Sequence, residues 1–136
     1  MNAIWLKIKK SALLSASFIS ERRYITDSLS QEEEKFPLAY SIVVHKDAGQ
    51  VERLLRAIYR PQNSYCIHID VKATTNFFLA LQNLADCFPN VFVSKKREDV
   101  IYTHFSRLQA DLNCMEVLLE VRSTLFFTYL CIYKLT

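Results

Sequence analysis

The segment 36–70 constrains the fold most, because it holds a strand, a helix and a second strand with almost no residues to spare. Residues 40–44 form a short apolar, β-branched run, as a buried parallel strand requires, and residues 64–69 have the same character. Asp47 can cap the helix between them, and Pro61 ends it. One apolar stripe runs along that helix at i, i+3, i+4 and i+7: Val51, Leu54, Leu55 and Ile58.

A polar side chain follows each of these two strands. His45 comes after the first strand and Asp70 after the second. In open α/β sheets, ligands bind outside the carboxyl ends of the strands. His45 and Asp70 are therefore candidate ligand-facing residues.

The chain continues in the same alternation. Thr74 or Thr75 can cap a helix that runs to about Ala85, and residues 91–94 have the pattern of a third strand. The helix that ends near Ala85 has Phe77, Leu81 and Leu84 on one face, which we expect to be buried. A loop and a helix over residues 105–120 follow, the latter predicted from the spacing of Leu108, Leu112, Met115 and Leu119.

This order of elements predicts the α/β class, as the amino-terminal, incomplete part of a doubly wound sheet. We expect three parallel strands in the order 2-1-3. Residues 1–35 form a lead-in segment, residues 36–120 the nucleotide-binding half of a domain, and residues 121–136 a divergent tail. The tail has no clear period, so it is either a buried edge strand or not part of the native fold.

Composition excludes several kinds of site. The 136 residues contain a single glycine, which excludes the glycine-rich phosphate loops. The net charge of +3 is too small to indicate nucleic-acid binding, and no basic stripe is interleaved with aromatic residues. Residues 7–20 only faintly resemble a signal peptide and are too short to span a bilayer, so we expect no transmembrane segment.

Four cysteines are present: Cys66, Cys87, Cys114 and Cys131. They allow three full pairings, and no Cys-x-x-Cys or His-x-x-x-His spacing indicates a metal site. Cys66 lies in a predicted strand and Cys114 in a predicted helix. The residues alone leave two interpretations open for them, inert buried thiols or one disulfide.

Four phrases carry a family resemblance: FPLAYSIVVHKD, RLLRAIYRPQNSYCIHIDVKA, CFPNVFVSKK and SRLQADLNCM. Over residues 16–119 the chain resembles the core-2 and I-branching β-1,6-N-acetylglucosaminyltransferases. The resemblance implies a GT-A-type fold and a Golgi membrane or luminal enzyme of O-glycan biosynthesis and protein glycosylation. It implies transfer of N-acetylglucosamine from UDP-N-acetylglucosamine to galactose or N-acetylgalactosamine of O-glycans or poly-lactosamine. It also implies independence from metals and cofactors.

The resemblance also implies which residues contact the donor nucleotide: Val43, Val44, His45, Asp70, Val71, Lys72 and Tyr102. Only a backbone contact is expected at Val71. Asp70 can accept hydrogen bonds from ribose or uracil, and Tyr102 offers a ring face and a hydroxyl. Apart from the resemblance, a loop histidine and a turn or capping aspartate explain His45 and Asp70 equally well.

Finally, the resemblance implies a disulfide between Cys66 and Cys114, with Cα atoms within about 7 Å. Cys87 is expected to lack its family partner, because Ser15 stands at that position, and Cys131 has no counterpart. No residue here matches the family's catalytic glutamate, its diphosphate-binding basic residues or its membrane anchor. We therefore expect an inactive, truncated member. The alternatives are a non-catalytic nucleotide-binding fragment and an unstable incomplete product.

Overall fold

The computed structural model describes residues 12–121 and 129–134, the latter as backbone only. Its elements are α2 (Ala12–Glu21), α3 (Gln31–Lys35), β1 (Leu38–Val44), α4 (Ala48–Ile58), β2 (Ser64–Ile69), α5 (Thr75–Ala85), β3 (Val91–Val93), α6 (Ser106–Val121) and β4 (Tyr129–Lys134). The side chains of Asp47 and Thr74 cap α4 and α5 by accepting hydrogen bonds from Gln50 N and Phe77 N. None of the helices in these ranges is long and apolar enough to cross a bilayer.

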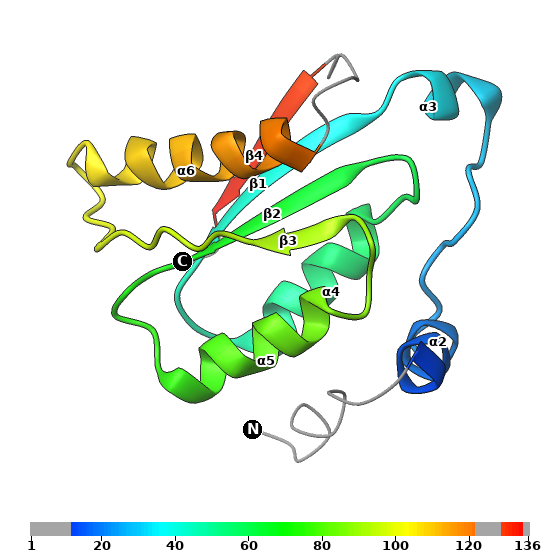
Figure 1. Ribbon diagram of the computed structural model, residues 1–136, viewed down its shortest axis with the longest axis horizontal. Helices are drawn as coiled ribbons and strands as arrows, with labels where there is room; N and C mark the ends of the chain where they lie inside the picture. Colours follow the sequence, from blue (N-terminus) through cyan, green and yellow to red (C-terminus); the bar gives the residue numbers. More distant parts are fainter. Residues whose placement is uncertain (1–11, 122–128, 135–136) are drawn as a thin grey trace.

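The strands form one parallel sheet with helices on both faces, which confirms the α/β, doubly wound class (Figure 1). Helices α4 and α5 lie on one face of the sheet, and α6 lies on the other (Figure 1). The sheet order is β3-β2-β1-β4.

The expected strand order 2-1-3 is wrong, because β2 and not β1 lies between the other two of the first three strands. Helices α4 and α5 contact each other on the same face, so both crossovers carry the chain in one direction along the sheet. The reversal comes later, when the chain passes over the opposite face as α6 and reaches β4 beside β1.

The tail contributes an edge strand, one of the two alternatives that its sequence left open. β4 pairs in parallel with β1, from Leu38 opposite Tyr129 to Val43 opposite Lys134. The side chain of Cys131 lies outside the described part of the structure, as do residues 7–11 of the signal-like segment.

The two faces of the sheet differ in chemistry. One face buries Tyr40, Ile42, Val44, Tyr65, Ile67 and Ile69 against α4 and α5, whose Phe77, Leu81 and Leu84 are buried as expected. The face under α6 carries a smaller cluster around Ala39 and Cys66, together with the fully buried polar side chains of Ser41 and His68. The sequence alternation on β1 and β2 thus separates an apolar core from a small polar layer.

Helix α6 packs through a face that its apolar spacing does not predict. Leu108, Leu112 and Leu119 are 51%, 40% and 63% exposed. Apart from Leu118, the residues of α6 that are buried are smaller or polar: Ala110, Asp111, Asn113 and Cys114. The leucine period therefore correctly predicts a helix but not its orientation.

A disulfide joins Cys66 of β2 to Cys114 of α6, with Cα atoms 5.5 Å apart. This confirms the pairing that the resemblance implied. Cys87 is a free, buried thiol, as expected, and it donates a hydrogen bond to Asn83 O at 3.4 Å. A hydrogen bond also joins its thiol to the side chain of Ser15, and burial raises the pKa of Cys87. The lead-in segment therefore meets Cys87 through an oxygen rather than a sulfur.

We expect the combined variant Cys66→Ala and Cys114→Ala to lose about 2–4 kcal/mol of unfolding free energy, because the bridge restricts the unfolded chain. Urea denaturation with and without reductant measures the loss. The Cys87→Ala variant keeps the bridge, so its stability should still fall when reductant is added. Stability of the wild-type chain that is insensitive to reductant would contradict the prediction.

Helix α2 and the segment after it are anchored to α4 by a buried carboxylate. Glu52 is fully buried and accepts hydrogen bonds from Arg22 at 3.2 and 2.6 Å and from the Tyr24 hydroxyl at 3.1 Å. Phe18 and Tyr24 are part of the main core. Part of the lead-in segment thus packs on the sheet domain.

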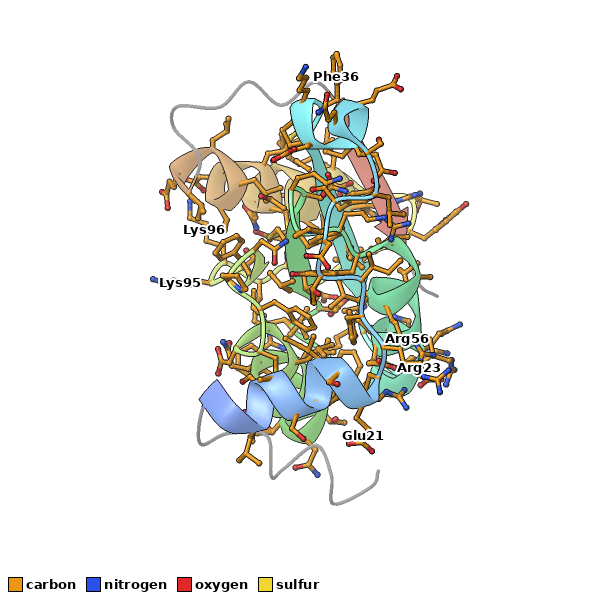
Figure 2. All side chains as sticks on the ribbon, turned by 90° about the vertical axis from the view of Figure 1, so that its right-hand side faces the viewer. Glu21, Arg23, Phe36, Arg56, Lys95 and Lys96 are labelled. Carbon is orange, nitrogen blue, oxygen red and sulfur yellow. A yellow bond between two sulfur atoms is a disulfide. The ribbon has the colours of Figure 1, made fainter. Side chains whose placement is uncertain are left out.

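The Arg22→Ala variant leaves the Glu52 carboxylate with one hydrogen-bond donor, and we expect a loss of about 1–3 kcal/mol of unfolding free energy. Arg23→Ala is the matched control, because the Arg23 side chain is exposed at the outer surface (Figure 2). Thermal or urea unfolding compares the two variants. Equal stability of both would show that the Arg22 contact contributes nothing.

Candidate functional site

The carboxyl ends of β1 and β2 form the edge at which the sequence predicted a site. Val44 is paired in register with Ile69, and Asp70 N donates a hydrogen bond to Val44 O at 2.9 Å. His45 and Asp70 therefore follow neighbouring strand ends. The His45 side chain is exposed, whereas Asp70 is only 4% exposed.

This edge coincides with the reversal of the strand order. β1 lies between β2, reached by way of α4, and β4, which follows α6 on the opposite face. In open α/β sheets the crevice at such a switch point is where ligands bind. Val43, Val44 and His45, at the end of β1, stand at that point.

The Asp70 carboxylate joins β2 to the segment 94–105, named here the β3–α6 loop. Its Oδ1 accepts a hydrogen bond from Lys72 N at 2.8 Å, and its Oδ2 accepts one from Val100 N at 3.1 Å. These bonds match the turn aspartate that was one of the two sequence interpretations. Each carboxylate oxygen can still accept a second hydrogen bond, so a ligand contact remains chemically open.

Two further residues fasten the β3–α6 loop to the end of β2. The Arg97 guanidinium donates to Ile69 O at 3.0 Å and to Asp70 O at 2.7 Å, and it lies 4.8 Å from the centre of the Phe78 ring. Glu98 N donates to His68 Nε2 at 3.1 Å. The loop is thus held from the apolar side of the sheet by Arg97 and from the polar side by His68.

The remaining predicted residues lie along the same loop. Val71 is exposed, but its N–H already donates to Glu98 O at 3.1 Å. Lys72 Nζ lies 2.8 Å from Asp99 Oδ1 and donates to Val100 O at 3.2 Å, and the hydrogen bond to Asp99 raises the pKa of Lys72. Tyr102 is 70% exposed, with the Arg107 guanidinium 5.4 Å from its ring centre.

The structure therefore brings the residues from β1, β2 and the β3–α6 loop to one edge of the sheet. Val43 and Val44 are buried, so only their backbone atoms could contact a ligand there. Two surface hollows lie elsewhere, one of about 560 Å³ along the outer edge of β3 and one of about 230 Å³ near the start of β1, and neither includes the predicted residues. In the described ranges, no group of three His, Cys, Asp or Glu side chains is placed to hold a metal ion.

Sequence reasoning missed the residues that hold the loop, namely His68, Arg97 and Glu98. His68 lies two residues after Cys66 on β2, so it shares the face that the disulfide assigns to α6. Once Cys66 is paired with Cys114, that alternation predicts a histidine buried beneath α6.

We expect Asp70→Ala to increase hydrogen exchange at the Lys72 and Val100 amides, because both lose their acceptor. The exchange rates are measured by NMR or mass spectrometry. Asp99→Ala is the control, because Asp99 is an exposed carboxylate of the same loop that pairs with the Lys72 side chain. Unchanged protection of the Val100 amide in Asp70→Ala would show that Asp70 does not fasten the loop.

Comparison with known proteins places this geometry in context. The family model described as "Branch: Core-2/I-Branching enzyme" matches residues 38–131, from the start of β1 into β4 and past residue 119, where the resemblance was expected to end. The β-1,3-galactosyl-O-glycosyl-glycoprotein β-1,6-N-acetylglucosaminyltransferase of Bos taurus is 55% identical over 108 residues, covering 79% of this chain and 25% of that protein.

Two human proteins are similarly related. The human β-1,3-galactosyl-O-glycosyl-glycoprotein β-1,6-N-acetylglucosaminyltransferase is 54% identical over 101 residues, covering 74% of this chain and 24% of its own length. The human N-acetyllactosaminide β-1,6-N-acetylglucosaminyl-transferase is 54% identical over 99 residues, covering 73% of this chain and 25% of its own length. The chain thus spans about a quarter of the length of the curated relatives that it matches.

Proposed function

Because this chain belongs to the Core-2/I-branching enzyme family, we propose that it forms the donor-nucleotide part of a β-1,6-N-acetylglucosaminyltransferase. The donor is UDP-N-acetylglucosamine. The acceptor is a galactose or N-acetylgalactosamine hydroxyl of an O-glycan or a poly-lactosamine chain, since the relatives' names specify β-1,3-galactosyl-O-glycosyl-glycoprotein and N-acetyllactosaminide acceptors. In the reaction, the acceptor oxygen bonds to the anomeric carbon while the bond to UDP breaks, and a base takes the hydroxyl proton.

The observation that carries the proposal is the position of the candidate residues at the switch point of the sheet. His45 follows β1 at the point where the strand order reverses, and the loop bearing Tyr102 is hydrogen-bonded to the adjacent end of β2. Nucleotides bind at this place in other doubly wound sheets.

Each residue type suits one part of a uridine nucleotide. The exposed ring of Tyr102 can stack on the uracil, and Asp70 can accept hydrogen bonds from uracil or ribose with its free lone pairs. His45 and Lys72 offer polar and cationic groups on the solvent side. Val43, Val44 and Val71 contribute backbone groups.

The proposal extends to the surroundings of the reaction. Positively charged groups outside the described site neutralise the departing UDP, so no metal ion is required. The enzyme works in the Golgi. A disulfide between Cys66 and Cys114 supports an oxidising compartment of this kind.

The test is a calorimetric titration of the purified chain with UDP. We expect binding, and we expect Tyr102→Ala to weaken it about tenfold because the stacking surface is lost, whereas Tyr102→Phe keeps most of the affinity. Phe105→Ala is the control, since Phe105 is an exposed aromatic residue at the end of the same loop. Absence of UDP binding, or equal affinities for the wild type and Tyr102→Ala, would overturn the assignment of the site.

A transfer assay with UDP-N-acetylglucosamine and a core-1 acceptor separates the two candidate functions. Turnover by the 136-residue chain would support the transferase and contradict the expectation that this chain is inactive. UDP binding without turnover would favour the non-catalytic nucleotide-binding fragment that the sequence left as an alternative.

A further inference from the structure

His68 is a fully buried histidine, and one of its ring nitrogens accepts a hydrogen bond from the β3–α6 loop. It lies on β2, on the sheet face covered by α6, and its side chain is 0% exposed. Nε2 accepts a hydrogen bond from Glu98 N at 3.1 Å, while Nδ1 bonds to no side chain among the described residues. Nε2 is therefore the nitrogen that fastens the β3–α6 loop.

This bond depends on the protonation state of the ring. Nε2 can accept from the Glu98 N–H only when it carries a lone pair, which places the single ring proton on Nδ1. A protonated imidazolium has two N–H groups and no lone pair. Protonation would therefore set two donors against each other and break the bond between β2 and the loop.

We propose that His68 is a positioning residue of the nucleotide site, which holds the β3–α6 loop and its Tyr102 in place when neutral and releases the loop at Glu98 when protonated. This inference rests on the proposed function. If it holds, the affinity of the site for its nucleotide depends on pH. The residue responsible, His68, is buried beneath the sheet edge and does not contact the nucleotide.

Three carboxylates interact electrostatically with His68. They are Glu98 of the loop, Asp70 at the end of β2 and Asp111 of α6, and their negative charges favour protonation. On β1, the residue paired with His68 is Val43, which does not titrate. Burial opposes the charge of the imidazolium and outweighs the three carboxylates, so the pKa of His68 lies below its ordinary value of 6.5.

The lowered pKa of His68 determines how folding stability and the attachment of the loop change with pH. Above its folded pKa, His68 is neutral and the bond to Glu98 is intact. As pH falls below 6.5, an unfolded histidine takes up a proton first, so folding loses stability until the pH has passed through the lower folded pKa. The loop should loosen over the same lower range.

Other ties keep the rest of the loop in place. The Arg97 guanidinium donates to two backbone carbonyls, which have no proton to gain or lose in this pH range. Asn113 Nδ2 donates to Glu98 Oε1 at 2.9 Å, a contact made by an amide that does not titrate. Protonation of His68 therefore loosens the loop at one point and does not unfold it, and the expected change in affinity is correspondingly moderate.

The experiment measures the affinity for UDP-N-acetylglucosamine, whose diphosphate does not titrate near neutral pH, at about pH 7.5 and about pH 5 by calorimetry. A second histidine, His45, lies at the same sheet edge, so all proteins carry His45→Gln. In that background we expect about threefold to tenfold weaker binding at the lower pH, the effect of one lost hydrogen bond. Adding His68→Gln should remove this pH dependence, because the Gln Oε1 accepts from Glu98 N at either pH.

The matched control is His104→Gln, which changes an exposed histidine of the same loop and should leave the pH dependence intact. A second readout needs no nucleotide: amide hydrogen exchange at Glu98, corrected for the intrinsic effect of pH, should lose protection as His68 protonates. This measurement is made on the wild-type chain, so it holds even if His68→Gln fails to fold.

The outcomes distinguish a failure of the proposed function from a failure of the role assigned to His68. If the wild-type chain binds no donor at about pH 7.5, the proposed function fails, while the exchange at Glu98 still decides the role of His68. Protection of Glu98 that does not change with pH, or a pH dependence of binding that persists in His68→Gln, would overturn the inference.

Discussion

The structure depends on the parallel pairing of β1 with β2, two strands buried on both faces. Their alternate residues are large and apolar on one side, as at Ile42 and Ile67, and small or polar on the other, as at Ser41 and His68. The apolar side takes α4 and α5, and the other side contacts α6 through small and polar residues together with Leu118. The placement of α4, α5 and α6 on the two faces of the sheet follows from this difference.

The same polar layer also holds the elements at the sheet edge where the proposed site lies. Ser41 donates to Asp111 Oδ1 at 2.8 Å, which ties β1 to α6, and His68 accepts from Glu98, which ties β2 to the β3–α6 loop. The geometry of the proposed donor site therefore depends on residues that a ligand does not reach. The buried layer and the exposed residues of the site form one structural unit.

Local patterns predicted the elements well and their arrangement less well. The strand ends at Val44 and Ile69, the caps Asp47 and Thr74, and the pairing of Cys66 with Cys114 all follow from residue types or from the family phrases. The strand order did not follow from them, because it depends on which face of the sheet each helix crosses. The periodicity of a helix does not indicate that face. The buried role of His68 was missed for a related reason, since it appears only once the face of β2 is assigned.

The disulfide has a mechanical consequence. It closes a covalent ring between Cys66 and Cys114, which are 48 residues apart, and this ring encloses α5, β3 and the β3–α6 loop. Tension applied along the backbone from outside the ring passes through the sulfur–sulfur bond and bypasses the enclosed residues. The segment that carries Tyr102 is thus shielded from forces that pull on the rest of the chain, and it can be displaced only from within.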